Sequence, residues 1–248
     1  VFAGITPVSV GGDSIGGTIQ VKSPAPVFAR AGEAPIVKGQ IGGFYRSNGD
    51  AQGYNFAATL AGEAVSLSYS ESNSEAGNYH AARAFKPVAP GTEGGLPIPG
   101  DIVGSSAYNG SRNRDIGLAL KHDKHLLQLN VSEQTVDFEG FPNQRMDMTA
   151  NTNTVANLRY KGQFEWGDLE ARVYGQDTDH KMDMGVDRYF YGTGMPMDTE
   201  ATTRGALIQA NIVPSENHTI RLGAEFQEYT LYDWWPAGGG SMGPNDFW

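Results

Sequence analysis

The strongest constraint on the fold is a regular alternation between short and long connections. These connections join runs in which every second residue is apolar, such as Tyr54 to Leu60 and Val65 to Tyr69. A period of two is typical of β-strands with one apolar face, and a short turn between two such runs makes an antiparallel hairpin. Short turns fall near residues 62, 123, 166 and 216, and longer breaks fall near residues 48, 90, 143, 190 and 240.

This alternation predicts an all-β fold, a transmembrane antiparallel β-barrel. Such barrels have short turns on one rim and long loops on the other, and their strands alternate between lipid-facing and lumen-facing residues. We count about nine strands in the sequence. The alternative is a soluble β-sandwich, in which short and long connections would be mixed and strands would seldom carry polar residues so regularly on one face.

Composition excludes several classes of protein. The chain of 248 residues has no cysteine, so it holds no disulfide and no thiolate metal site. Its net charge of -10 argues against a nucleic-acid partner, which would need a basic surface. No apolar run reaches the roughly 18 residues of a membrane helix. We find no GxSxG, HExxH or phosphate-binding motif, so we do not expect an enzyme or a catalytic cofactor.

A glycine-rich segment near the start carries a family resemblance. Residues Val8 to Pro24 contain two glycine pairs, at 11–12 and 16–17, and the second leads into the alternating strand Thr18 to Lys22. This segment resembles the end of the plug domain in TonB-dependent outer-membrane receptors, where a Gly-Gly-Xaa-Ile-Xaa-Val strand closes the plug. The resemblance implies that residues 1–24 end a plug, 25–35 form a hinge, and 36–248 begin the barrel.

The resemblance also implies a location and partners. The receptor would be a multi-pass β-barrel in the lipid of the cell outer membrane, energised by the TonB-ExbB-ExbD complex through a plug segment outside this chain. Nine strands are fewer than half of the 22 that plugged transporters have. The chain shows no signal peptide at Val1 and ends in a Gly-, Pro- and Met-rich stretch. We therefore expect an internal portion of a longer protein, with open sheet edges that its missing strands would cover.

Three Met-Xaa-Met pairs suggest a metal site. They are Met146 and Met148, Met182 and Met184, and Met195 and Met197. His180 precedes the second pair, and residues i and i+2 of an extended chain point to the same side. Thioether and imidazole groups together suit copper, especially Cu(I). The alternatives are methionines that fill an apolar core or contact aromatic rings at the barrel rim.

A second resemblance narrows the ligand. The run from Leu169 to Asp183, followed by Met195 to Thr199 and Thr203 to Gly205, resembles a barrel segment of TonB-dependent copper receptors. There a His-Xaa-Met pair on the barrel joins a Cys and a Met of the plug in holding copper, and His180 and Met182 match this pair. The implied function is uptake of copper ion from the extracellular vestibule above the plug.

Two other functions stay open. The same fold would import a ferric siderophore or another metal chelate if aromatic residues of the loops line the vestibule. These aromatic residues would also be explained by an interfacial girdle or by the core of a loop. These aromatics are Tyr189, Tyr191, Trp234 and Trp235. A passive porin or an adhesin barrel is the remaining alternative, and the plug-like segment argues against it.

Other polar and aromatic residues have simpler interpretations. His122, His125 and His218 are expected to be solvated in short periplasmic turns, and His80 has no methionine neighbour. Tyrosines near strand ends are expected to form interfacial girdles; they are Tyr69, Tyr160, Tyr229 and Tyr232. Acidic loop residues would attract cations; they are Asp137, Glu139, Asp147, Asp183, Asp187 and Asp198.

Overall fold

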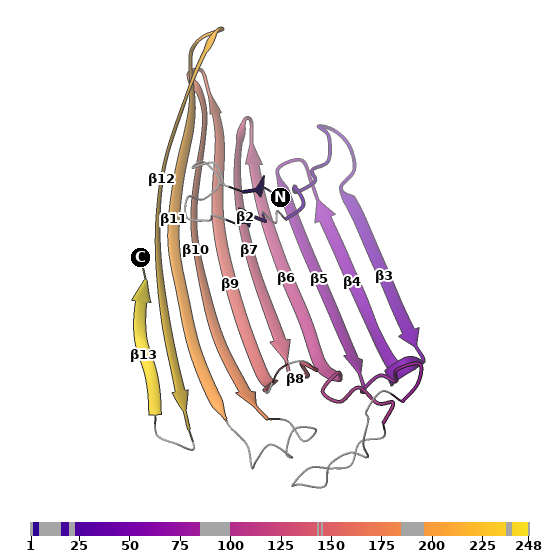
Figure 1. Ribbon diagram of the computed structural model, residues 1–248. Coiled ribbons are helices and arrows are strands. Elements are labelled where there is room, and N and C mark those ends of the chain that lie inside the picture. Colours follow the sequence, from indigo (N-terminus) through magenta and orange to yellow (C-terminus); the bar gives the residue numbers. More distant parts are fainter. Residues whose placement is uncertain are drawn as a thin grey trace.

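The chain forms one long antiparallel sheet in which neighbours in sequence are neighbours in space (Figure 1). The computed structural model describes residues 2–4, 16–19, 23–84, 100–142, 144, 146–184 and 196–236, and the backbone of 240–247. The sheet has eleven strands: β3 (Ile36–Arg46), β4 (Ala51–Ala61), β5 (Val65–Ala76), β6 (Tyr108–His122), β7 (His125–Val136), β8 (Phe138–Glu139), β9 (Asp147–Phe164), β10 (Gly167–Asp183), β11 (Met197–Ser215), β12 (His218–Trp235) and β13 (Gly240–Phe247).

Three smaller features belong to the described structure. The short strand β8 lies off the main path and pairs with β6 and β9. The strands β1 (Phe2–Ala3) and β2 (Gly17–Thr18) pair separately as a two-stranded sheet. A single 3-10 turn, η2 (Asn48–Asp50), joins β3 to β4. No helix in the described ranges is long and apolar enough to cross a membrane.

The predicted short turns are confirmed. The connections between β4 and β5, β6 and β7, β9 and β10, and β11 and β12 are tight, and they gather at one end of the sheet (Figure 1). Two of them need a positive φ: Asp123 has φ 51° and Gly167 has φ 141°. Aspartate and glycine tolerate such conformations better than most residues, which explains their presence in turns this short. The longer connections lie at the opposite end. The prediction of a longer break near residue 48 is wrong, because a tight turn at residues 47–50 joins β3 to β4 at this end.

The strands are longer than the sequence pattern predicted. The loop expected from Asp137 to Ala150 ends earlier, because β9 begins at Asp147. The prediction that the final loop begins at Trp234 is also wrong. β12 continues to Trp235, and a further strand, β13, follows at Gly240–Phe247. These extensions are rich in Thr, Asn and Asp and lack the apolar alternation that marks the central part of each strand.

The two faces of the sheet differ in polarity. On the outer face, apolar residues of neighbouring strands meet in register: Leu67 pairs with Leu118, and Leu118 with Leu129. These three side chains remain 48%, 36% and 39% exposed, so the sheet does not bury them within the described chain. An exposed apolar band of this kind is what a membrane barrel presents to lipid.

Aromatic residues border this band at the short-turn end. His125 Nδ1 lies 2.7 Å from the hydroxyl of Tyr160, and the ring of Phe164 stacks on Trp166 at 5.0 Å. The expectation that His125 is solvated is therefore wrong; it belongs to an aromatic girdle. His122 is exposed as expected. Tyr229 pairs with Thr203 on the opposite face, so its assignment to a girdle is also wrong.

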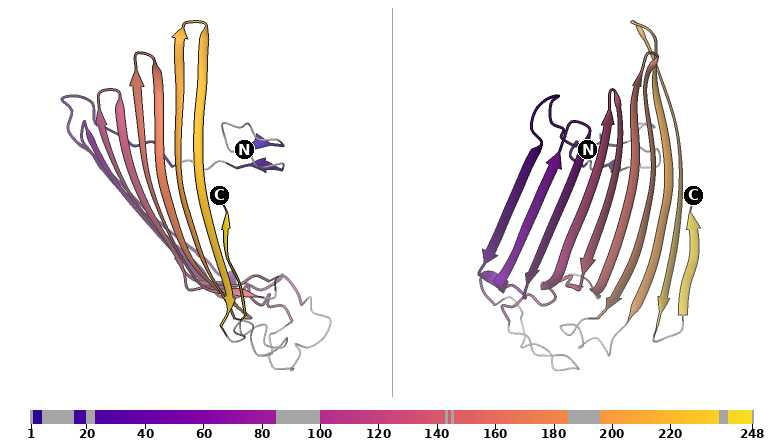
Figure 2. Two further views of the ribbon diagram at one scale, coloured as in Figure 1. Left: turned by 90° about the vertical axis from the view of Figure 1, so that its left-hand side faces the viewer. Right: turned by 180° about the vertical axis from the view of Figure 1, so that it is seen from behind.

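The other face carries the N-terminal residues, and we call it the inner face (Figure 2). The buried Ala29 donates its N–H to the carbonyl of Gly62 at 3.0 Å. The ammonium of Lys121 lies 4.6 Å from the ring centroid of Phe28. These contacts attach the segment before β3 to the short-turn end of the sheet. The assignment of this segment as a hinge after a plug stays a prediction.

Candidate metal site

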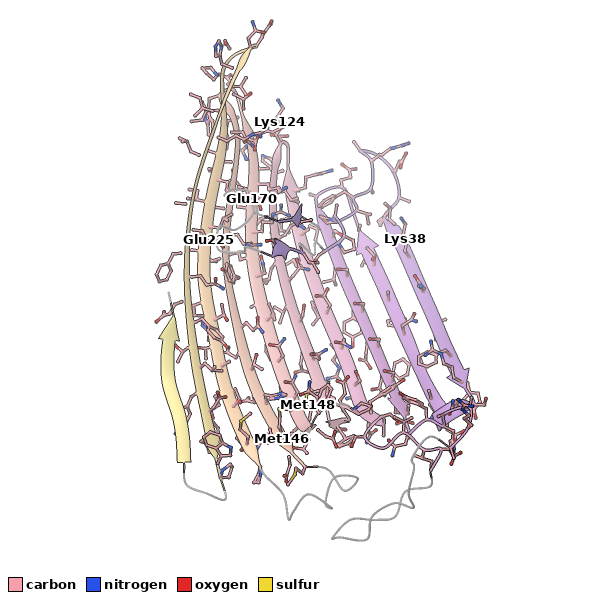
Figure 3. The ribbon with its side chains drawn as sticks, in the orientation of Figure 1. Lys38, Lys124, Met146, Met148, Glu170 and Glu225 are labelled. Carbon is pink, nitrogen blue, oxygen red and sulfur yellow. The ribbon has the colours of Figure 1, made fainter. Side chains whose placement is uncertain are left out.

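The strand register brings one methionine of each predicted pair into a single row. Met182 of β10 is the Cα partner of Met148 in β9 and of Met197 in β11. Directly paired residues in an antiparallel sheet share a face and have Cβ atoms about 4.5–5.5 Å apart. Three thioether side chains from three adjacent strands therefore lie side by side on the inner face. Figure 3 shows Met148 near the end of the sheet opposite Lys124.

A local irregularity produces this alignment. Lys181 pairs with Ala150, but the next residue, Met182, pairs with Met148, because the register shifts between them. The extra residue in β9 is Thr149. Such a β-bulge re-aims side chains near the end of a strand. Without it, Met182 would face Thr149 and the row of sulfur atoms would be broken.

His180 lies next to this row, two residues before Met182 on the same face. It pairs with Asn151 in β9 and Thr199 in β11. Its Nδ1 donates to Oδ1 of Asn151 at 3.1 Å, since a carbonyl oxygen can only accept. The other ring nitrogen, Nε2, then carries the lone pair. A hydrogen bond from the nitrogen that does not bind the metal is the usual way to orient a metal-binding histidine.

The electrostatic surroundings favour the neutral form of His180. On the outer face of β10 the apolar residues end at Val173, and Asp177 and Asp179 follow, so His180 lies beyond the apolar band. Burial lowers the pKa of His180, while the nearby charge of Asp233 raises it by less. Neutral imidazole is the form that binds metal.

The carboxylate of Asp233 also lies near His180. Asp233 of β12 pairs with Thr199, whose hydroxyl donates to Oδ1 of Asp233 at 2.5 Å. Met242 of β13 is in turn the Cα partner of Asp233. Asn151 and Asp233 were not predicted from the sequence. Asp233 continues the alternation of Tyr229 and Leu231, so a longer strand assignment would have placed it on this face.

The remaining predicted residues divide into three groups. Met146 is half-buried just before β9, and Met184 is 7% exposed just after β10; no contact places either of them in the row. Met195, Tyr189 and Tyr191 lie outside the described residues. The prediction that Trp234 and Trp235 belong to a loop is wrong, because both end β12. Trp234 stacks on Tyr232 at 5.0 Å on the outer face, away from the row, while Trp235 follows on the inner face.

Acidic residues do not form a hard-metal site in the described part of the chain. No group of three or more His, Asp or Glu side chains is placed to hold a metal among the described residues. Asp147 is fully buried and accepts from the hydroxyl of Ser105 at 2.7 Å and from the N–H of Phe141 at 2.9 Å. Its expected role in attracting cations is therefore wrong. Through these two hydrogen bonds, Asp147 instead connects two loop segments to the start of β9.

Comparison with known proteins agrees with this architecture. No family model and no curated protein matches the sequence. Among solved structures, the copper transporter OprC aligns with a TM-score of 0.70 and 17% identity over 93% of this chain and 33% of that chain. The FrpB iron transporter from Neisseria meningitidis aligns with a TM-score of 0.59 and 18% identity over 82% of this chain and 32% of that chain.

The chain has the barrel fold of TonB-dependent outer-membrane receptors. The predicted fold class, a partial transmembrane β-barrel, is thereby confirmed. The chain spans about a third of the length of each of these two structures.

Proposed function

We propose that this chain is part of a TonB-dependent outer-membrane transporter that takes up copper, with His180 and Met182 as barrel-side ligands. The observation that carries the proposal is the row of Met148, Met182 and Met197 beside His180. Several thioethers and one imidazole make a soft donor set, which suits Cu(I) and suits Mg²⁺ or Ca²⁺ poorly. The plug would supply further ligands, and TonB would supply energy through it.

The similarity to a copper transporter supports this proposal, and the similarity to an iron transporter supports a second one. In the second, the same barrel imports a ferric chelate. Trp235 on the inner face would then contact the organic part of the ligand, together with Tyr189 and Tyr191, which the sequence predicts to lie in a loop. The methionines would have no role in binding.

Metal content separates the two proposals. The full-length protein, purified in detergent, is incubated with Cu(I), Cu(II), Fe(III) and Zn(II), and bound metal is measured after gel filtration. We expect about one copper per protein in the parent and little in the His180→Ala/Met182→Ala variant. His122→Ala is the control, because this exposed turn histidine should leave the copper content unchanged.

Each other result decides against part of the proposal. Equal copper in the parent and the double variant would remove His180 and Met182 from the site. No copper in the parent would reject copper uptake and leave the chelate as the ligand to be tested.

A further inference from the structure

One half of the inner face is lined almost entirely by hydroxyl and amide groups. Every second residue of β5 is serine on this face: Ser66, Ser68, Ser70, Ser72 and Ser74. Across the register, Ser72 pairs with Asn55 in β4 and with Asn113 in β6. The same row continues through Gln134 in β7 to Asn153 in β9. We give the name serine wall to six residues of this region. They are Ser70, Ser72, Asn113, Ser132, Gln134 and Asn153.

The serine wall lines a hollow and carries little charge. All six of its residues border this hollow on the inner face. Asp115 is the single charged inner-face residue among the described lining residues, and it accepts a hydrogen bond from the hydroxyl of Ser132 at 2.6 Å. Glu71, Arg114 and Glu133 also border the hollow, but they alternate onto the outer face and pair with one another there.

The amide groups of the wall hold one another in place. Nε2 of Gln134 donates to Oδ1 of Asn113 at 3.0 Å, and Nε2 of Gln176 donates to Oδ1 of Asn153 at 2.9 Å. The wall therefore presents fixed, neutral oxygen-containing side chains rather than mobile charged ones.

The other half of the inner face is different. Arg159 forms a two-point ion pair with Glu170 at 2.6 and 2.8 Å, and Lys161 lies 3.3 Å from the same carboxylate. Arg172 packs its guanidinium on the ring of Tyr174 at 5.0 Å. The hydroxyl of Tyr174 in turn donates to the carboxylate of Glu225 at 3.4 Å. Charged side chains of both signs therefore line this charged half, whereas the serine wall is nearly neutral.

The serine wall is continuous with the candidate metal site. Asn153 lies two residues from Asn151 on the same face of β9, and Asn151 accepts the hydrogen bond from His180. Thr178, two residues before His180, also donates to Oδ1 of Asn153 at 2.9 Å. No charged side chain separates His180 from the wall among these described residues.

We infer that the serine wall is the lane along which the metal ion leaves the His180 site once the plug has moved. This inference rests on the proposed function. Hard neutral oxygens bind a soft cation weakly, so copper moves from thioether ligands to groups that do not retain it. Conduction requires such weak successive contacts, because a strong site in the path would trap the ion.

A bulky residue in the lane should slow uptake without removing copper from its site. In the full-length transporter, Ser72→Trp is compared with Gln209→Trp; both positions are half-buried on the inner face, and Gln209 pairs with Glu170 in the charged half. We expect Ser72→Trp to lower the initial rate of radioactive copper uptake at least tenfold while bound copper stays at the parent level. Gln209→Trp should change the rate less than twofold.

A second variant keeps the test decisive if Ser72→Trp does not fold. Ser70→His/Ser72→Met places a second His-Xaa-Met pair in the lane, and it should bind additional copper and slow uptake. Unchanged uptake in the folded Ser72 variants, or an equal loss in Gln209→Trp, would overturn the lane. Absence of copper from the parent itself would instead reject the proposed function.

Discussion

At the scale of single residues, the charge of Asp233 tunes His180. Asp233 raises the pKa of His180 against the larger lowering by burial. Replacing Asp233 with Asn should therefore lower this pKa further, and His180 would stay neutral and able to bind metal at lower pH. We expect copper retention in Asp233→Asn to extend to lower pH than in the parent, as measured by metal content across a pH series below about 6.5.

The control for this prediction is Asp198→Asn. Asp198 forms an ion pair with Lys181 at 3.2 Å on the outer face. Removing the charge of Asp198 should therefore leave the pH dependence of copper retention unchanged. A shift of the Asp233→Asn profile to higher pH would contradict the assigned electrostatics.

Gly167 is a second residue with a specific constraint. Its φ is 141°, and a Cβ placed there would collide with the carbonyl oxygen of Asn211. Gly167→Ala should therefore lower the free energy of unfolding by about 1–3 kcal/mol, the usual range for such strain. Urea unfolding in lipid vesicles, followed by tryptophan fluorescence, measures this. Gly62→Ala is the matched turn variant with open space around it, and an equal loss there would contradict the assignment.

At the scale of elements, the ion pairs of the charged half connect β9 to β10. Removing Glu170 leaves Arg159 and Lys161 partly buried without their carboxylate. Glu170→Ala should cost about 1.5–3 kcal/mol, as expected for charge-assisted hydrogen bonds. Denaturant unfolding in the same vesicles measures the loss.

The exposed pair of Arg30 and Glu33, at 3.6 Å, provides the comparison. Arg30→Ala should change the free energy of unfolding by less than about 0.5 kcal/mol, because surface pairs contribute little. Similar losses in Glu170→Ala and Arg30→Ala would show that the pair on the inner face does not connect the strands.

The strands were predictable from sequence where every second residue is apolar. Runs such as Leu127 to Val131 alternate clearly, so their existence and the short turns were found. The strand ends were not predictable, because stretches such as residues 151–154 are polar on both faces and resemble a loop. The register of neighbouring strands is what extends them, and one sequence does not reveal that register.

The same limit applies to the candidate site. His180 and Met182 were identified because they lie two residues apart in one strand. Asn151 and Asp233 come from other strands, and the alignment of Met148 depends on a bulge at Met182. Long-range pairing and a one-residue shift in register therefore decide the site.

At the scale of the whole molecule, one sheet separates two environments. Its outer face carries an exposed apolar band, and its inner face carries the row of Met148, Met182 and Met197, the serine wall and the charged half. This difference between the faces follows from the period of two along every strand. We propose that sulfur atoms of three strands and one imidazole bind copper on the inner face.

X-ray absorption at the copper edge tests this claim most directly. It is measured on the copper-loaded full-length protein and on the Met148→Leu/Met182→Leu/Met197→Leu variant. We predict sulfur and imidazole scatterers around copper in the parent, with fewer sulfur atoms in the variant. Copper surrounded by oxygen and nitrogen alone, or a sulfur signal unchanged by the triple substitution, would contradict the assigned site.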